Sequence, residues 1–284
     1  MSLRDFADHL GVSRRTVAKW EAGGRTLYPG QANQEALDAS LTLAGPEVRA
    51  RFAASVASPA VGSSPGGQLT HPVDRKVMVL VEAGSFLCGL DGRESWLPTY
   101  FIDMFPTTNG DYRRFVEATG HRPPPHWPAG ACPESLLDHP VVSVTWHDAA
   151  AYAGWADKAL PEDQEWEKAA RGPRGAAYPW GGRTVDLDTA GNVREVGIGT
   201  TTPVGRYPDG VSPYGAHDMV GNVWEWCATR AGPGRRRLIG GAYSGSLADA
   251  APAAGRDAPA GTLSPDVGFR CVAAARPTFD LLSI

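Results

Sequence analysis

The sequence predicts an α+β protein with little regular secondary structure. Glycine (34 residues), proline (24) and tryptophan (9) are abundant, which is typical of a loop-rich fold held together by packed rings and not of a helical bundle. Short apolar runs that suit strands alternate with helical patterns along the second part of the chain. Hydrophobic residues make up 42% of the chain and charged residues 20%, as in an ordinary globular protein.

Composition excludes several classes of protein. The 284 residues suit one large domain or two smaller ones, and the net charge of −4 argues against a polycation. No apolar run approaches the roughly 18 residues that span a bilayer, and the N-terminus MSLRDFADHL lacks the apolar segment of a secretory signal. The cysteines form no CxxC pair, so neither a zinc ribbon nor a thioredoxin motif is indicated. We expect a cytoplasmic protein with free thiols and no membrane partner.

The first segment, residues 1–57, is expected to form a small all-α domain. Apolar residues recur at helical spacing from Leu3 to Leu10, and a second helix from Arg14 to about Glu21 follows the N-cap residue Ser13. The string SLRDFADHLGVSRRTVAKWEAGG resembles the lambda-repressor-like family of helix-turn-helix domains. That resemblance implies DNA as a partner, contacted by Arg14, Arg15, Thr16 and Lys19. The alternative is a degenerate helical domain used for dimerisation or docking.

A linker and a larger domain follow. The stretch from Phe52 to Val73 carries no charged residue and is rich in Gly, Ser and Pro, which predicts a flexible linker at 58–72. The second domain is expected over 73–277, with a tail at 278–284. Its expected elements, in order, are a strand, turn and strand within Met78–Gly89, an extended piece at Tyr100–Asp103, a helix capped by Asn109, an extended run at His139–Trp146, a helix opened by His147 and Asp148, and a helix at Asp163–Arg171 ended by Gly172.

Seven motifs of the second domain point to one family. They are VLVEAGSFLCG, FIDMFPTTNGDYRRFVEATG, HPVVSVTWHDAAAYAGWADKALPEDQEWEKAARG, YPWG, DMVGNVWEW, IGGAY and GFRC. In this order they resemble the formylglycine-generating enzyme (sulfatase-modifying factor) family. The resemblance implies a C-type-lectin-like fold, which agrees with the low content of regular structure expected from composition.

The family's active cysteines have no counterpart in this chain. The resemblance implies two copper-binding cysteines, five residues apart, that drive the oxygen-dependent conversion of a sulfatase cysteine to formylglycine. The corresponding segment, GGAYSGSLADA, has Gly245 and Ala250 at these positions. Because Cu(I) requires soft ligands such as thiolates, we expect neither copper nor formylglycine-generating activity. The family's disulfide positions are Ala153 and Ala170, and the four cysteines are expected to be small buried hydrophobic residues.

The same resemblance implies calcium as a structural ion. Its ligands would be the side chains of Asp218 and Glu225 and the backbone carbonyls of Gly221 and Val223. Calcium prefers such oxygen ligands. The alternative role of the two carboxylates is capping and ion pairing without a metal. A second family site would use Asn192, Val193 and Ile198, but its acidic position is Val196, so that site is expected to be weak or empty.

Two classes of function remain. In the first, the domain keeps its scaffold without catalysis and binds a peptide, protein or small molecule through Tyr243, Ser244, Ser246, Asp249, Arg256 and Asp257. In the second, it is an oxidative enzyme that uses residues other than the cysteine pair. A variant of the first is a variable protein of a diversity-generating retroelement, with residues 242–267 as the diversified segment. The triplet Arg235–Arg237 is expected to be a solvated loop or strand edge, with a phosphate contact as the alternative.

Overall fold

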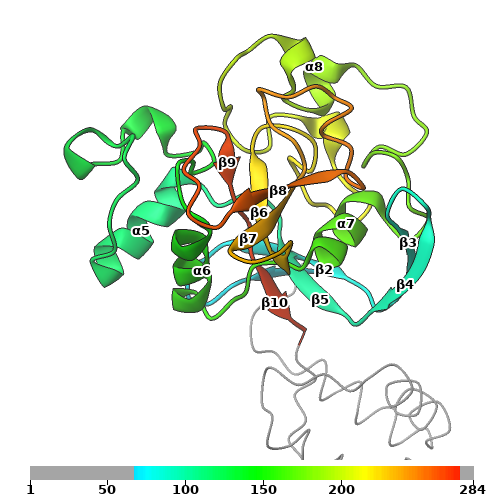
Figure 1. Cartoon of the computed structure of the whole chain (residues 1–284), viewed down its shortest axis with the longest axis horizontal. Helices are drawn as coiled ribbons and strands as arrows, with labels where there is room; N and C mark the ends of the chain where they lie inside the picture. Colours follow the sequence, from blue (N-terminus) through cyan, green and yellow to red (C-terminus); the bar gives the residue numbers. More distant parts are fainter. Residues whose placement is uncertain (1–66, 276–284) are drawn as a thin grey trace, which may run out of the picture. The chain divides into compact units, whose positions relative to one another are not determined.

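The computed structural model describes residues 67–275 (Figure 1). The chain divides into two compact units, and all described residues belong to the unit at 61–275. The predicted DNA-binding side chains Arg14, Arg15, Thr16 and Lys19 lie outside the described residues, as do most of the linker and the tail. The helix-turn-helix therefore stays a prediction. No helix in the described part is long and apolar enough to cross a membrane.

Short strands and helices joined by long loops make up the described domain, which confirms the α+β prediction. The strands are β1 (Gln68–Thr70), β2 (Val77–Val81), β3 (Gly84–Cys88), β4 (Arg93–Leu97), β5 (Tyr100–Asp103), β6 (Trp224–Arg230), β7 (Arg235–Ile239), β8 (Gly255–Pro259), β9 (Val267–Gly268) and β10 (Val272–Ala274). The α-helices are α5 (Asn109–Thr119), α6 (Trp146–Trp155), α7 (Asp163–Arg171) and α8 (Leu187–Ala190). Short 3₁₀ turns occur at Pro128–Gly130, Glu134–Leu136, Arg194–Val196 and Pro208–Gly210.

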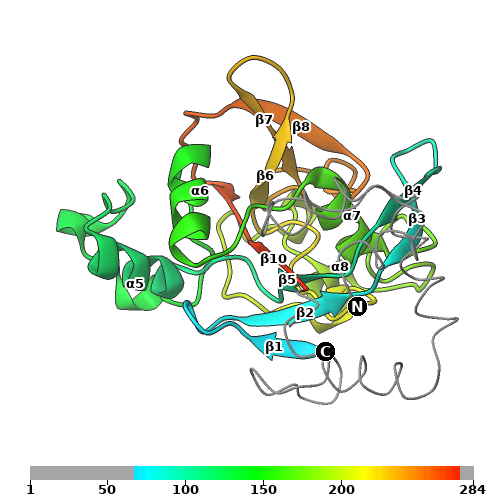
Figure 2. The same ribbon diagram turned by 90° about the horizontal axis from the view of Figure 1, so that it is seen from below.

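Three sheets organise these strands. The first has the order β1-β2-β5-β10, the second is the hairpin β3-β4, and the third has the order β8-β7-β6-β9. Strand β10, near the end of the described chain, pairs with β5 from its beginning, so the sheet closes the domain (Figure 2). In the third sheet only the β6–β9 pair is parallel.

Strand β6 is central because both of its faces are covered. Trp226 packs into one apolar core with α5 and α6, whereas Cys227 packs on the opposite face into a second core with α7. Figures 1 and 2 show α6 and α7 on different sides of this sheet. Successive strand residues point to opposite faces, so β6 supplies both cores at once, with Trp224 and Trp226 on one face and Cys227 on the other.

The helix starts depend on side-chain caps that the sequence revealed only in part. Helix α7 has the predicted bounds, and Gly172 follows it with a φ of 71°. Helix α5, however, is capped by Thr108 and not by Asn109, because the Thr108 side chain accepts from the Asp111 backbone N–H. The Asn109 side chain is buried and donates instead to the carbonyls of His139 and Pro140. The cap predicted at Asn109 was therefore wrong by one residue.

Two further expectations need correction. The predicted linker at 58–72 is too long, because residues 68–70 form β1 and pair with β2. The run from His139 to Trp146 is not a regular strand: Pro140 makes one isolated bridge to Thr108, and Ser143 has a φ of 55° that breaks the extended backbone. Helix α6 begins at Trp146 after the cap Thr145, one residue before the expected start.

Candidate ligand-binding site

The two positions predicted to replace the family's cysteines have very different surroundings. Ala250 is fully buried in a small core with Trp180, Val193 and Val220. Gly241 lies so close that a Cβ added to it would be 2.3 Å from the Ala250 Cβ, which explains why a glycine with a φ of 73° precedes this segment. Gly245 is half-buried, and its carbonyl accepts from the Arg194 N–H. Neither residue offers a metal ligand in its side chain.

The native cysteines lie elsewhere in the fold. All four are free, and Cys88, Cys227 and Cys271 are buried, as the sequence predicted, whereas Cys132 is half-buried. Burial raises the pKa of the Cys227 and Cys271 thiols well above the usual value, so both stay protonated at neutral pH. These residues cannot supply the thiolates that Gly245 and Ala250 lack.

Three of the predicted ligand residues gather around the loop before β9. The Ser244 hydroxyl donates to Asp266 Oδ2 (2.6 Å), and the Tyr243 hydroxyl donates to the Pro265 carbonyl (3.3 Å). An Arg256 nitrogen is 3.9 Å from Asp266 Oδ1, and its guanidinium carbon lies 4.6 Å from the centre of the Trp224 ring. Asp266 and Trp224 are the residues that sequence reasoning missed. The position of Asp266 directly before the VGFR stretch was the available signal.

The other three predicted residues do not join this group. Asp249 Oδ2 accepts from the backbone and hydroxyl of Ser246 (3.0 and 2.7 Å), so these two residues form a local turn. Asp257 pairs with Arg237 (3.2 Å) and, as the neighbour of Arg256 in β8, points to the opposite face of the sheet. Asp257 therefore departs from the expected common surface, and ligand binding by the six residues stays a prediction.

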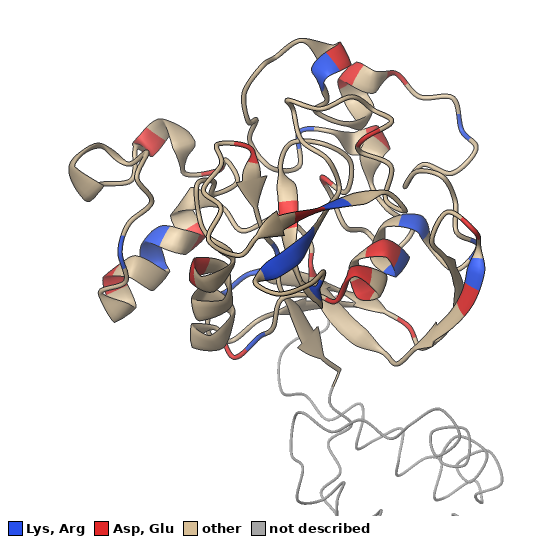
Figure 3. Ribbon diagram, viewed as in Figure 1, with Lys and Arg blue, Asp and Glu red and all other residues tan. Residues whose placement is uncertain are grey.

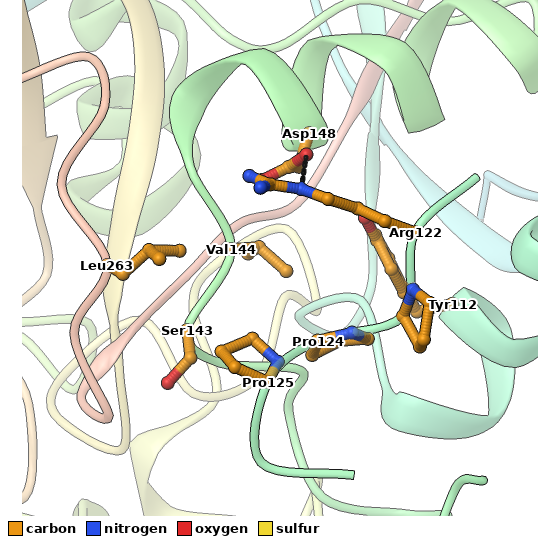
Figure 4. Close-up of a pocket in the computed structure, with 9 residues that line it drawn as sticks. Tyr112, Arg122, Pro124, Pro125, Ser143, Val144, Asp148 and Leu263 are labelled. Atoms are coloured by element: carbon orange, nitrogen blue, oxygen red, sulfur yellow. Dashed lines mark hydrogen bonds and ion pairs between the residues drawn. The ribbon is translucent and has the colours of Figure 1, made fainter. Parts of the chain in front are cut away.

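A hollow of about 110 Å³ adjoins the same loop (Figure 4). Its apolar wall consists of three consecutive prolines, Val144 and the half-exposed Leu263. The complete lining is Tyr112, Arg122, Pro123, Pro124, Pro125, Ser143, Val144, Asp148 and Leu263. Figure 4 shows Arg122 reaching across the hollow to Asp148, and the Oδ2 to nitrogen distance is 3.1 Å.

Asp148 organises the polar side of this hollow. Burial by itself would raise the pKa of this carboxyl, but hydrogen bonds from Arg122, Thr145 and His121 hold it below its usual range. Ser143 forms the opposite wall, and its N–H donates to the Ser264 carbonyl (2.9 Å). The hollow and the Tyr243, Ser244 and Arg256 group therefore share the loop at 262–266.

Comparison with known proteins identifies the family. The sulfatase-modifying factor enzyme 1-like domain matches residues 68–275. The chain belongs to this family. The start of the match at residue 68 coincides with β1 and agrees with the shorter linker.

Relatives of this sulfatase-modifying-factor-like domain include proteins without the family's activity. Inactive C-alpha-formylglycine-generating enzyme 2 of Mus musculus is 33% identical, over 77% of this chain and 92% of that protein. The fold is shared with PvdO from Pseudomonas aeruginosa, with a TM-score of 0.63 at 21% identity over 75% of this chain and 100% of the other. Treponema denticola variable protein 1 has a TM-score of 0.59 at 17% identity, over 75% and 100%.

The calcium ligands that the family implies fit this domain only in part. Glu225 is fully buried, and both of its oxygens accept hydrogen bonds, from Arg270 (2.7 and 2.8 Å) and from the Trp166 indole (2.7 Å). The guanidinium thus already neutralises this carboxylate, and Glu225 does not fit a calcium cage. Burial raises the pKa of Asp218 to about 6, partly offset by a hydrogen bond from the Gly205 N–H. A cation would stabilise the buried charge of Asp218, so Asp218 suits a calcium ligand better than Glu225 does.

The second calcium site that the family implies keeps one side chain that could act as a ligand. Asn192 is fully buried, and its side-chain oxygen has no hydrogen-bond partner, while its nitrogen donates to the Thr200 carbonyl (2.9 Å). Val196, at the acidic position, brings no charge. Among the described residues no group of three or more His, Cys, Asp or Glu side chains could hold a metal ion. Calcium at either site, including the part of Gly221 and Val223, stays a prediction.

Proposed function

We propose that this sulfatase-modifying-factor-like domain is a non-catalytic binding module that recognises a peptide or protein. The observation that carries the proposal is the closed centre after β7. Ala250 is completely buried and Gly245 has no side chain, so these two positions offer no thiolate and no other ligand for copper. A scaffold with a closed centre can still bind at its surface.

The surface around Asp266 has the chemistry of such a site. The Arg256 side chain is 49% exposed, and stacking on Trp224 restricts its guanidinium plane while its N–H groups stay available. Tyr243 and Ser244 add an aromatic ring and a hydroxyl at the same loop. A rigid aromatic group beside adaptable polar groups is the combination found at many protein-binding surfaces. The adjoining apolar hollow can accept a small aliphatic side chain.

One relative supports the absence of catalysis in this proposal. The mouse protein that resembles this chain over most of its length carries the name of an inactive formylglycine-generating enzyme. In our proposal the N-terminal residues 1–57 couple ligand recognition to DNA, through Arg14, Arg15, Thr16 and Lys19. The alternative, an oxidative enzyme that uses other residues, makes an opposite prediction about products.

Mass spectrometry of a cysteine-containing sulfatase-type peptide separates these two functions. The purified full chain, incubated with and without copper in air, should leave the cysteine unchanged, whereas an active formylglycine-generating enzyme in the same buffer should convert it. An aldehyde product formed by this chain would refute the non-catalytic proposal and establish the enzyme alternative.

Selection from a displayed peptide library tests the binding role directly. We expect enriched peptides whose binding to the full chain weakens with Arg256→Gln and Ser244→Ala. The control is Arg93→Gln, which removes an exposed arginine from β4 in another sheet. Peptides that ignore the first two substitutions would place the binding surface elsewhere. The retroelement variant predicts, in addition, a near-copy of the coding segment for 242–267 beside a reverse-transcriptase gene.

A further inference from the structure

The hollow beside the loop at 262–266 has a rigid apolar wall and a polar end. Helix α5 ends at Thr119, and Gly120 follows it in a left-handed conformation (φ 70°) that redirects the chain. Three consecutive prolines at 123–125 form the wall, which is rigid because proline fixes φ. Among the residues that line the hollow only Arg122 and Asp148 are charged. Figure 3 shows basic colour on the loop after α5 and acidic colour at the start of α6.

The Arg122 guanidinium uses only one of its edges inside the domain. Its Nε and one terminal nitrogen face the Asp148 carboxylate, at 3.4 Å from Oδ1 and 3.1 Å from Oδ2. No hydrogen bond joins the other terminal nitrogen to any described residue, and 65% of the side chain is exposed. Since the guanidinium carries its N–H groups in a fixed planar fork, the edge formed by its two terminal nitrogens stays available to a second carboxylate.

The charge of Asp148 is compensated without that second edge. Thr145 donates to Oδ2 through its backbone N–H (2.9 Å) and its hydroxyl (2.6 Å), and a His121 ring nitrogen lies 2.9 Å from Oδ1. Together with the contact from Arg122, these bonds satisfy both carboxylate oxygens. The negative charge is thereby spread over several donors, which reduces its repulsion of an anion at the far edge of Arg122.

The Tyr112 hydroxyl is a second unused donor at the same end of the hollow. Tyr112 is 1% exposed and lines the hollow, yet its hydroxyl has no hydrogen-bond partner among the described residues, whereas a buried tyrosine usually finds one. Figure 4 shows this hydroxyl on the side of the hollow where Arg122 lies. Burial and the nearby Asp148 raise the pKa of Tyr112, so the hydroxyl stays protonated and can donate. A buried donor beside a guanidinium edge suits a negatively charged acceptor.

We propose that this hollow binds the C-terminal residue of a peptide that ends in a branched aliphatic side chain. The proposal rests on the binding role above and names the chemistry of the partner. The terminal carboxylate accepts from the free edge of Arg122 and from the Tyr112 hydroxyl, and the aliphatic side chain packs against the prolines, Val144 and Leu263. A closed cavity of about 150 Å³ holds one benzene molecule. A hollow of about 110 Å³ therefore suits a valine, leucine or isoleucine side chain better than an indole.

The small size of the hollow favours a C-terminal residue over an internal acidic one. Both donors and the apolar wall line the same hollow, so the carboxylate and the aliphatic group of the ligand must be joined closely. In a C-terminal residue both groups are attached to the same Cα. In an extended peptide, by contrast, an acidic residue and its aliphatic neighbour point to opposite faces, so only one of them can enter the hollow.

Fluorescence anisotropy with the full chain tests the site. The probe is the pentapeptide Gly-Ser-Gly-Ser-Leu, with a fluorophore at its N-terminus and a free C-terminal carboxylate. The comparison peptides are the same sequence with a C-terminal amide, a free acid that ends in Trp, and an amidated peptide with Leu-Asp inside the sequence. We expect the free acid that ends in Leu to bind best. The amide should bind about ten-fold more weakly, because it loses a charge-assisted hydrogen bond.

Two substitutions with matched controls locate the binding. Tyr112→Phe removes only the hydroxyl, and Arg122→Gln removes the charged fork, so each should weaken the free acid about five-fold. Tyr214→Phe, in the core with α7, and Arg93→Gln, on β4, make the same changes elsewhere, and each should change the affinity by less than about two-fold. Because no described residue bonds to the Tyr112 hydroxyl, Tyr112→Phe should keep the wild-type melting temperature.

Three outcomes would overturn this inference. The first is equal affinity of the acid and the amide for the wild-type chain. The second is binding of the acid to Tyr112→Phe and Arg122→Gln that equals wild-type binding. The third is tighter binding of the internal Leu-Asp peptide, which would assign the hollow to acidic side chains.

Failure of the binding role itself gives different results. It appears as formylglycine in the mass-spectrometric assay. If the acid and the amide bind alike while displayed peptides still depend on Arg256, the binding role stands and only the assignment of this hollow is wrong.

Discussion

Replacing Ala250 by cysteine tests whether the centre after β7 is closed. An added sulfur has no space there, because Ala250 is fully buried among Trp180, Val193 and Val220 and faces the backbone of Gly241. Adding a heavy atom to a well-packed core costs about 1–3 kcal/mol. The matched change Gly245→Cys behaves differently. A Cβ at Gly245 would meet its nearest neighbour, the Asp249 Cβ, at 3.6 Å, which is an ordinary contact.

The free energy of unfolding measures the difference. Urea denaturation should show a loss of about 1–3 kcal/mol for Ala250→Cys and a change within about 0.5 kcal/mol for Gly245→Cys. Thiol labelling under native conditions gives a second reading. The thiol introduced by Gly245→Cys should react quickly with the labelling reagent. The thiol introduced by Ala250→Cys should react slowly, because the reagent reaches it only when the fold opens.

Equal stability of the two variants would refute this reasoning, and so would equal labelling rates. Either result would mean that position 250 adjoins open space. The closed centre would then no longer support the non-catalytic proposal. The wild-type protein serves as the control for labelling of the native thiols, because Cys132 is half-buried and the other three cysteines are buried.

Three other predictions concern charge. In chelator, the free energy of unfolding should fall as pH rises from about 4 to about 6, because burial raises the pKa of Asp218 to about 6 and the folded protein holds this proton more tightly than the unfolded chain. The contribution is about 3 kcal/mol at most, and Asp218→Asn should remove this pH dependence. Calcium should raise the melting temperature by mass action, and the same Asp218→Asn change should abolish the rise. Duplex DNA from the protein's own locus should bind the full chain with steep salt dependence, and the double change Arg15→Gln and Lys19→Gln should weaken it.

Each of these has a clear contrary result. A pH profile of Asp218→Asn parallel to that of wild type would show that other groups cause the slope. Melting temperatures that are equal in calcium and in chelator would leave Arg270 as the counter-ion of Glu225 without a metal nearby. DNA binding that is insensitive to salt, or to the two substitutions, would favour a docking role for residues 1–57.

Local signals in the sequence predicted several elements well. Helix α7 could be placed from its acidic start, its apolar Trp166 and the following Gly172, since all of these act within a few residues. The cap of α5 was misplaced because Thr108 and Asn109 are both good capping residues, and only the fold shows that Asn109 is needed by the carbonyls of the 139–140 segment. Strand β1 was hidden because a three-residue strand has almost no periodicity.

The candidate site divides in the same way. Adjacent residues in a sequence look equivalent, but strand geometry sends Arg256 and Asp257 to opposite faces, so only one of them reaches the surface around Asp266. Likewise, a run of three arginines cannot show that the middle one is backed by Trp146 from a helix about ninety positions earlier in the chain. The sequence by itself determined the family, the helices α5, α6 and α7 to within a residue, and the residues Gly245 and Ala250 in the segment after IGGAY, because these depend on residue identity and local order. Which charges meet, which face each side chain takes and whether position 250 is closed were decided only by the tertiary structure, because these depend on long-range packing and strand register.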